Sequence, residues 1–286
     1  SDGSVRENDI NKEVRNADLL GGIMDLEADD TGVYGVGYSQ NSGQANIEGA
    51  FKADWSSGDL DWLADCHGDN YDIYPTTDVV YVAGHTHDCT NIGGLSNSYT
   101  LYHFGVAYTN YATGTVAKNP FSGYANHAGQ PAPTNLNFYP DFTAGTYTGK
   151  HQANWTVEGN DKYVVYGGEF TAVNGTPQQG LTRFARRDIA TNKQGPELSG
   201  SNYPVTATSP ESGVVHLAFS TNWDEDDKTL TYKVYRDSTD TDPIWTKDVT
   251  AGYWEHPDLV VADSVDPGSS HQYLVTVSDP WGNTVQ

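Results

Sequence analysis

The sequence predicts an all-β protein in which part of a β-propeller, about three blades, is followed by a β-sandwich. The 286 residues include 30 Gly, 13 Pro, 19 Tyr, 7 Trp and 8 Phe, a composition that favours short strands and turns. One strand pattern occurs three times in the first two thirds of the chain. Later in the chain, several short strands alternate apolar and polar residues, which is typical of a sandwich.

The repeated pattern starts with an apolar strand that ends in or near glycine, at residues 32–38, 79–85 and 163–170. A second, alternating strand follows at residues 48–54, 104–108 and 181–186. Strand-built repeats of roughly 40–50 residues are typical of propeller blades, and glycine allows the close approach of the inner strands. Propellers need about four to eight blades, so we expect other chains or further parts of a longer polypeptide to complete the ring.

A long connection at about residues 115–150 separates the second repeat from the third. Its prolines predict an irregular path, and connections of this length often carry function. We expect the partial propeller to span residues 1–198. The sandwich is expected to span residues 199–286, with its last strand truncated.

The balance of charge limits the possible partners. The chain has 38 acidic and 15 basic residues, a formal net charge of -23, which repels nucleic acids and anionic lipid headgroups. It is compatible with loading of divalent cations. No run of about 18 apolar residues exists, so we expect no membrane insertion. Residues 1–15 lack the apolar stretch of a signal peptide, so any targeting segment is expected outside this chain.

Two cysteines, Cys66 and Cys89, are predicted to form a disulfide; two reduced thiols are the alternative. In the chain-entropy model, closing a loop of this length stabilises the fold by about 3 kcal/mol. Because disulfides persist in oxidising compartments, the pair predicts an extracellular or cell-surface protein.

Histidines and carboxylates flank the cysteines. If residues 85–87 form a strand, His85 and His87 share one face, and with Asp69 they are candidate ligands of a divalent cation. Zinc bound by both cysteines with His67 and His87 is another possibility. The strings GDNYD and GHTHD also occur in dinuclear metallophosphoesterases, but here they lie too close together, without the α/β alternation of that fold. We expect structural histidines beside a disulfide, no catalytic residue and no cofactor.

Three other groups of residues are candidates for a chemical or binding role. Glu48 and Glu169 occupy similar repeat positions; a glycosidase pair needs carboxyls about 5–10 Å apart, and repeat symmetry explains them more simply. The acidic run at residues 224–227 lacks the spacing and glycine of an EF-hand and is expected to be an exposed loop. Candidates for stacking on sugars, of which we expect one or two to do so, are Trp55, Trp62, Trp155, Trp223, Trp245 and Trp254.

Two families resemble parts of the chain. YGGEFTAVNG at residues 166–175, followed by LTRFA, resembles a blade of bacterial secreted propellers with delta-60-type repeats. DCHGD and HTHDCTNIGG resemble a subgroup found in large multidomain actinobacterial surface proteins. Residues 203–286 are similar to a fibronectin type III domain through VVHLAF, YKVYR, Trp254, the strand around Tyr273 and DPWGN. The resemblance implies a secreted or surface binding role and brings no catalytic residues.

We therefore expect a non-catalytic extracellular module for adhesion, glycan binding or assembly. Its expected partners are other modules of the same polypeptide, neighbouring subunits or glycans. One alternative is a hydrolase whose active site lies in a propeller channel completed by missing blades. Another is a structural subunit of a larger surface or virion assembly. A hydrolase should gather ionisable groups at one end of the channel, whereas a scaffold should show bonded cysteines and dispersed histidines.

Overall fold

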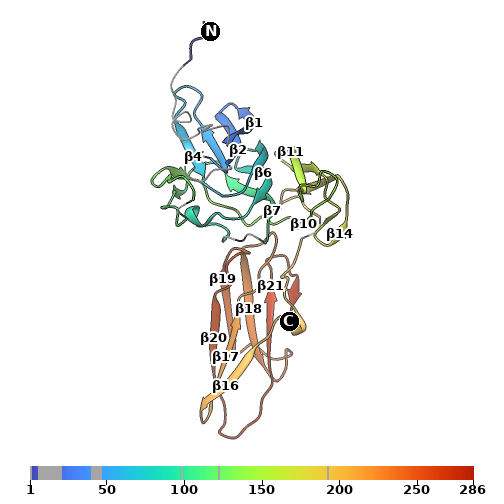
Figure 1. The fold of residues 1–286 in the computed structure, drawn as a ribbon. Helices are drawn as coiled ribbons and strands as arrows, with labels where there is room; N and C mark the ends of the chain where they lie inside the picture. The colour runs from blue at the N-terminus through green and yellow to red at the C-terminus, as the bar shows by residue number, and fades with distance from the viewer. Residues whose placement is uncertain are drawn as a thin grey trace. The chain divides into compact units, whose positions relative to one another are not determined.

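The computed structural model describes residues 2–5, 21–39, 47–96, 98, 100–121, 123–191 and 193–286. The chain is all-β, as predicted, with 46% strand and 2% helix in several antiparallel sheets. It divides into two compact units, residues 1–190 and 191–286 (Figure 1). Most of residues 1–15, in which no signal peptide is predicted, lies outside the described residues. No closed propeller is formed by the described residues, and none of their helices is long and apolar enough to cross a membrane.

Three antiparallel sheets form the body of the first unit, and each follows the order of its strands in the chain. The first sheet contains β1 (Gly21–Asp29), β2 (Gly32–Ser39), β3 (Ala50–Ala53) and β4 (Leu60–Ala64). The second contains β5 (Asn70–Pro75), β6 (Val79–Thr86) and β7 (His103–Thr109). The third contains β11 (Asn154–Asn160), β12 (Tyr163–Gly168) and β15 (Leu181–Ala185). The strands predicted from the three repeats belong to these sheets.

Neighbouring sheets pack on one another through their first strands, with β5 against β1 and β2, and β11 against β5 and β6. Apolar side chains fill the space between the second and third sheets, among them Ala83, Phe104 and Val157. Hydrogen bonds also cross the same boundary: the Tyr74 hydroxyl donates to the Gly159 carbonyl over 2.6 Å. The packing therefore joins apolar burial to specific polar contacts.

The first strand of each sheet carries a β-bulge at an equivalent place. The pairing register shifts between Ile23 and Asp25, between Asn70 and Asp72, and between Asn154 and Thr156. The extra residues are Met24, Tyr71 and Trp155. The residue before each bulge pairs with a glycine, and a Cβ added at the second of these, Gly84, would meet the Asp69 carbonyl oxygen at 2.6 Å. A bulge bends a strand and redirects a side chain, so the repeats present three equivalent side chains at one end of the sheets.

The connection at residues 115–150 is mostly irregular, as predicted. It contains β8 (Gly114–Thr115), β9 (Pro131–Ala132) and β10 (Phe142–Thr143), and β10 pairs with β13 (Ala172–Val173), which pairs with β14 (Thr176–Pro177). A short 3-10 helix, η2 (Thr90–Ile92), precedes it. Val116 and Ala132 pack with Phe51 and Leu63 of the first sheet, so this connection covers part of that sheet's apolar face.

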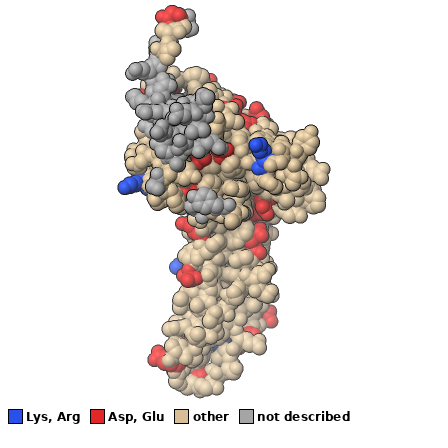
Figure 2. All heavy atoms as spheres, viewed as in Figure 1, with Lys and Arg blue, Asp and Glu red and all other residues tan. Residues whose placement is uncertain are grey.

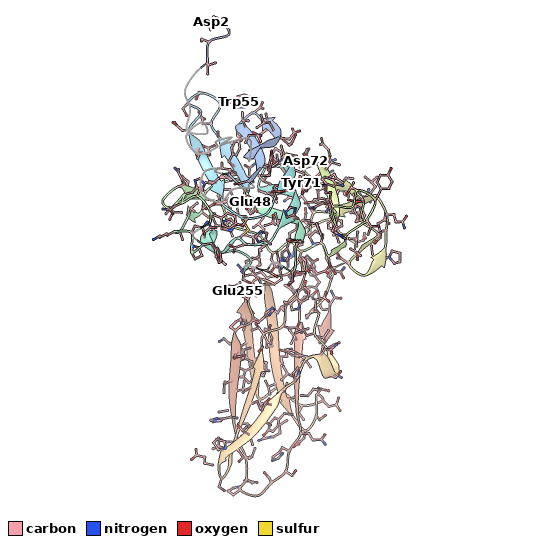
Figure 3. The ribbon with its side chains drawn as sticks, viewed as in Figure 1. Asp2, Glu48, Trp55, Tyr71, Asp72 and Glu255 are labelled. Atoms are coloured by element: carbon pink, nitrogen blue, oxygen red, sulfur yellow. A yellow bond between two sulfur atoms is a disulfide. The ribbon has the colours of Figure 1, made fainter. Side chains whose placement is uncertain are left out.

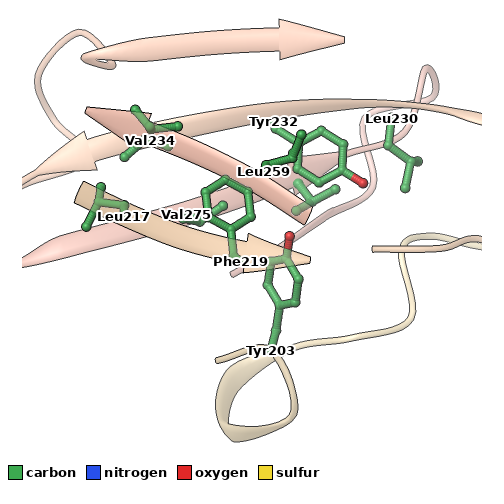
Figure 4. Packing of buried hydrophobic residues seen from close by; sticks show 10 residues of the cluster. Tyr203, Leu217, Phe219, Leu230, Tyr232, Val234, Leu259 and Val275 are labelled. Atoms are coloured by element: carbon green, nitrogen blue, oxygen red, sulfur yellow. The ribbon is translucent and has the colours of Figure 1, made fainter. Parts of the chain in front are cut away.

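The second unit consists of two sheets. One contains β16 (Thr206–Glu211), β17 (Val214–Ser220) and β20 (Asp258–Ser264). The other contains β18 (Thr229–Arg236), β19 (Trp245–Thr250), β21 (Tyr273–Ser278) and β22 (Thr284–Val285). A 3-10 turn, η3 (Gly200–Asn202), precedes them. Leu217 and Phe219 of the first sheet pack with Tyr232, Val234 and Val275 of the second in one apolar core (Figure 4). Alternation along β17, β18 and β21 places these residues inward.

Candidate functional site

Four aromatic side chains meet at the bulged end of the sheets in the first unit: Tyr71, His85, Tyr102 and Trp155, which we call the aromatic cluster. The Tyr71 and Trp155 ring centroids lie 4.8 Å apart, and those of His85 and Tyr102 lie 5.2 Å apart. The His85 ring also lies 5.9 Å from Tyr71. Tyr102 is 39% exposed, and Tyr71 and Trp155 are partly exposed. Two successive bulges thus build a surface on which a flat apolar ligand face can rest.

Polar contacts fix the His85 ring in place, and one of them is to Tyr71 of the aromatic cluster. The Asp69 backbone N–H donates to Nε2 over 3.2 Å, and Nδ1 lies 2.9 Å from both the Tyr71 hydroxyl and the Gln152 side-chain amide. Burial, followed by the nearby His87, lowers the pKa of His85 to about 4, so the ring is neutral at physiological pH. Both ring nitrogens contact protein groups, and a cation bound by the predicted set of Asp69, His85 and His87 would have to displace these hydrogen bonds.

A carboxylate lies beside the Trp155 indole. Glu169 accepts hydrogen bonds from the backbone N–H of Thr148, over 2.9 Å, and from the Thr148 hydroxyl. These two bonds, with smaller contributions from Tyr147 and Trp155, lower the pKa of Glu169, so the group is ionised at neutral pH. The neighbouring Tyr147 side chain is 96% exposed. The cluster therefore joins aromatic rings to a fixed negative charge.

Glu48 lies in different surroundings from Glu169. Burial, together with the charges of Asp69 and Asp65, raises the pKa of Glu48 to about 8, against one opposing hydrogen bond from the Gly68 N–H. Its Oε2 atom is shielded from solvent and accepts no hydrogen bond from the described residues. Glu48 is therefore protonated at neutral pH. Its acidic neighbours are Asp69 and Asp65, whereas Glu169 contacts Thr148 and Trp155, so repeat position does not pair the two glutamates.

The predicted disulfide is confirmed. Cys66 and Cys89 are bonded and fully buried, with their Cα atoms 4.4 Å apart. The zinc site built from these two cysteines is therefore wrong, because neither sulfur is a thiolate. Next to the bond, His67 Nδ1 lies 2.9 Å from Asp88 Oδ2, and the two residues form an isolated β-bridge.

The histidines that flank the two cysteines are gathered rather than dispersed, contrary to the expectation for a scaffold. His87 lies 6.1 Å from Tyr102 and 6.3 Å from His67, measured between ring centroids. His67 in turn stacks on Tyr124 at 3.6 Å. The bonded cysteines agree with the expectation for a scaffold, and the gathered histidines do not.

The acidic run in the second unit is not the exposed loop that its composition predicted. Asp224 and Asp227 are 1% and 2% exposed, because the Asp224 Oδ1 atom accepts hydrogen bonds from the backbone N–H groups of Asp226 and Asp227 and curls the loop inward. Oxygens of Asp224, Asp227 and Asp279 lie within 4.8 Å of one another, the one such group of possible metal ligands found among the described residues. Burial, then Asp226 and Asp279, raises the pKa of Asp224 to about 8.

The tryptophans predicted to stack on sugars differ in exposure. Trp155 belongs to the aromatic cluster, Trp55 is 57% exposed and Trp62 is fully buried. Sequence reasoning missed Tyr71 and Tyr102 as members of a site. A signal for Tyr71 was present: Asn70 and Asn154 each precede an aromatic residue at the same place in the repeat.

No family model matches the chain, and no curated protein matches it. Among solved structures, it shows a weak similarity to a glycoside hydrolase family 43 arabinoxylan arabinofuranohydrolase from Bacillus subtilis in complex with cellotetraose. The identity is 11% and the TM-score 0.25, over 91% of this chain and 64% of that one. The chain thus spans less than two thirds of that structure.

Proposed function

We propose that this chain is a non-catalytic, extracellular glycan-binding module whose ligand rests on the aromatic cluster. The observation that carries the proposal is the bulge-directed pair of Tyr71 and Trp155, partly exposed and beside the ionised Glu169. The apolar face of a sugar ring stacks on aromatic rings, and sugar hydroxyls bond to polar groups at their rim. The buried disulfide supports an oxidising compartment.

The proposal includes the architecture. The three sheets with equivalent bulges support a partial propeller whose remaining blades come from other parts of the polypeptide or from neighbouring subunits. The second unit is proposed to be a fibronectin type III-like spacer of a multidomain surface protein of the actinobacterial type. A flat face of loops at one end of stacked blades is the usual place where a propeller binds a partner.

The test is binding of the purified protein to soluble xylan, mannan, mixed-linkage β-glucan and starch by affinity electrophoresis. Trp155→Ala should weaken binding at least about tenfold, or about 1.4 kcal/mol, because it removes a stacking surface. Trp55→Ala is the matched control, since Trp55 is exposed on the same unit but lies apart from Tyr71 (Figure 3). Unfolding curves of both variants exclude a loss of fold. The proposal fails if none of the four polymers binds, or if Trp155→Ala binds as well as the parent.

A hydrolase is the second candidate, and Glu48 is the observation that favours it. A carboxyl that stays protonated at neutral pH beside a second carboxyl, here Asp69, is the arrangement of a general acid with its partner. The shielding of Glu48 Oε2 from solvent argues against it. Release of reducing ends from the same polymers, abolished by Glu48→Gln, would support a hydrolase, and its absence would exclude one on these substrates.

A further inference from the structure

The electrostatic surroundings of the aromatic cluster carry information about its ligand. Glu169 is held in place by both hydrogen-bonding groups of Thr148, and its lowered pKa keeps the charge present over the whole physiological range. The loop that supplies these bonds approaches closely at Gly145, where an added Cβ would lie 1.8 Å from the Glu169 carbonyl oxygen. The two hydrogen bonds from Thr148 therefore hold the Glu169 carboxylate in one position beside Trp155.

The four side chains of the aromatic cluster do not offset this charge. His85 is neutral at physiological pH. Burial, and to a lesser extent the charge of Asp69, raises the pKa of the Tyr71 hydroxyl, so this group is uncharged as well. Outside the cluster, the loop that carries Thr148 also contains the exposed Lys150 and the exposed His151. Asp and Glu side chains are spread over the visible surface, with fewer Lys and Arg (Figure 2), in keeping with the net charge of -23.

We infer that the aromatic cluster selects glycans without acidic groups and rejects uronic, sialylated and sulfated chains. This rests on the proposed glycan-binding function. An acidic sugar whose ring stacks on Trp155 would bring its carboxylate near Glu169, because the indole contacts that side chain. Salt at physiological ionic strength screens charges only over about 8 Å, so the two negative groups would repel. A neutral sugar meets no such repulsion. Selection of neutral glycans therefore arises from repulsion of acidic ones as well as from stacking of the neutral ones.

The test compares each of the four polymers in hydroxyethylated form with the same polymer in carboxymethylated form, which keeps the backbone and changes the charge. In about 20 mM salt, the carboxymethylated form should bind the parent protein at least tenfold more weakly, and about 500 mM salt should narrow the difference. Glu169→Gln, which keeps the shape of the side chain, should also narrow the difference in binding between the hydroxyethylated and carboxymethylated forms. Glu211→Gln removes an equal charge from an exposed site on the second unit and should leave the difference unchanged.

Each outcome decides the question. Equal or tighter binding of the carboxymethylated polymers would overturn the inference and leave the glycan-binding function standing. An unchanged difference in Glu169→Gln would also overturn it, because another group would then set the preference. Failure of every polymer, charged or neutral, would refute the glycan-binding function itself.

Discussion

The two units pack their sheets together in different ways. In the first unit, some polar contacts cross the boundaries between sheets, as where the half-buried Asp72 carboxylate accepts a hydrogen bond from the Val157 N–H of the third sheet over 2.8 Å. In the second unit, one apolar core joins both sheets, and the buried carboxylates gather in the loops that hold Asp224 and Asp279. Apolar packing is non-directional, so a series of small sheets needs directional bonds to set how each lies on the next.

The largest expected effect is a core truncation in the second unit. Leu217→Ala should cost about 2–5 kcal/mol, because it leaves a cavity at a fully buried position. Calorimetry should show a lower transition for the second unit and an unchanged one for the first. Leu181→Ala, at a side chain that is 61% exposed in the first unit, is the control and should change stability by less than about 0.5 kcal/mol. A shift of both transitions by Leu217→Ala would show that the units do not unfold independently.

Removal of the disulfide should act on the first unit alone. The double variant Cys66→Ser and Cys89→Ser should lose about 3 kcal/mol, since the cross-link no longer restricts the unfolded chain. Urea unfolding with and without reductant measures this. The two cysteines are the only ones in the chain, so the second unit supplies an internal control. If the oxidised and reduced parent proteins unfold at the same urea concentration, the predicted stabilisation is wrong.

Asp224 should make the second unit more stable in acid. Its pKa rises from 3.8 to about 8 on folding, so this stability is fully present below pH 3.8 and is lost as the pH rises through 8. Asp224→Asn, which carries no charge, should remove on the order of 1–2 kcal/mol of the stability difference between pH 5 and 9, after allowance for screening. Chelator keeps divalent cations from neutralising the three carboxylates. An unchanged pH dependence of the second transition in this variant would contradict the expectation.

Glu48 should make the first unit more stable in acid as well, with a smaller change in stability than Asp224 gives the second unit. The pKa rises from 4.5 to about 8, so stability is full below pH 4.5 and falls as the pH rises through 8. Glu48→Gln should remove about 1 kcal/mol of that fall from the first transition, after allowance for screening. Glu211→Gln should not change it. A changed pH dependence of the second unit's unfolding transition in Glu48→Gln would contradict the expectation that this residue acts on the first unit alone.

Local patterns predicted much of the fold. The sequence predicted the alternating strands β17 and β18 and the glycine-ended strands of the three repeats. It could do so because strand periodicity depends only on residues that are close together in the chain. The disulfide was readable because the chain has only two cysteines. The exposed-loop interpretation of residues 224–227 failed because acidic composition describes average behaviour. Asp279, which lies far along the chain, meets Asp224 and Asp227 only in the folded state.

The candidate site separates what the sequence determined from what only the tertiary structure decided. By itself, the sequence determined an all-β chain of repeated strands with one disulfide and a strongly acidic surface, since these follow from composition and short-range order. Only the tertiary structure decided that Tyr71, Tyr102 and Trp155 meet around a neutral His85 beside an ionised Glu169. The bulges that turn Tyr71 and Trp155 toward each other depend on the pairing of two strands and on the packing of one sheet against the next. No single segment of sequence contains that information.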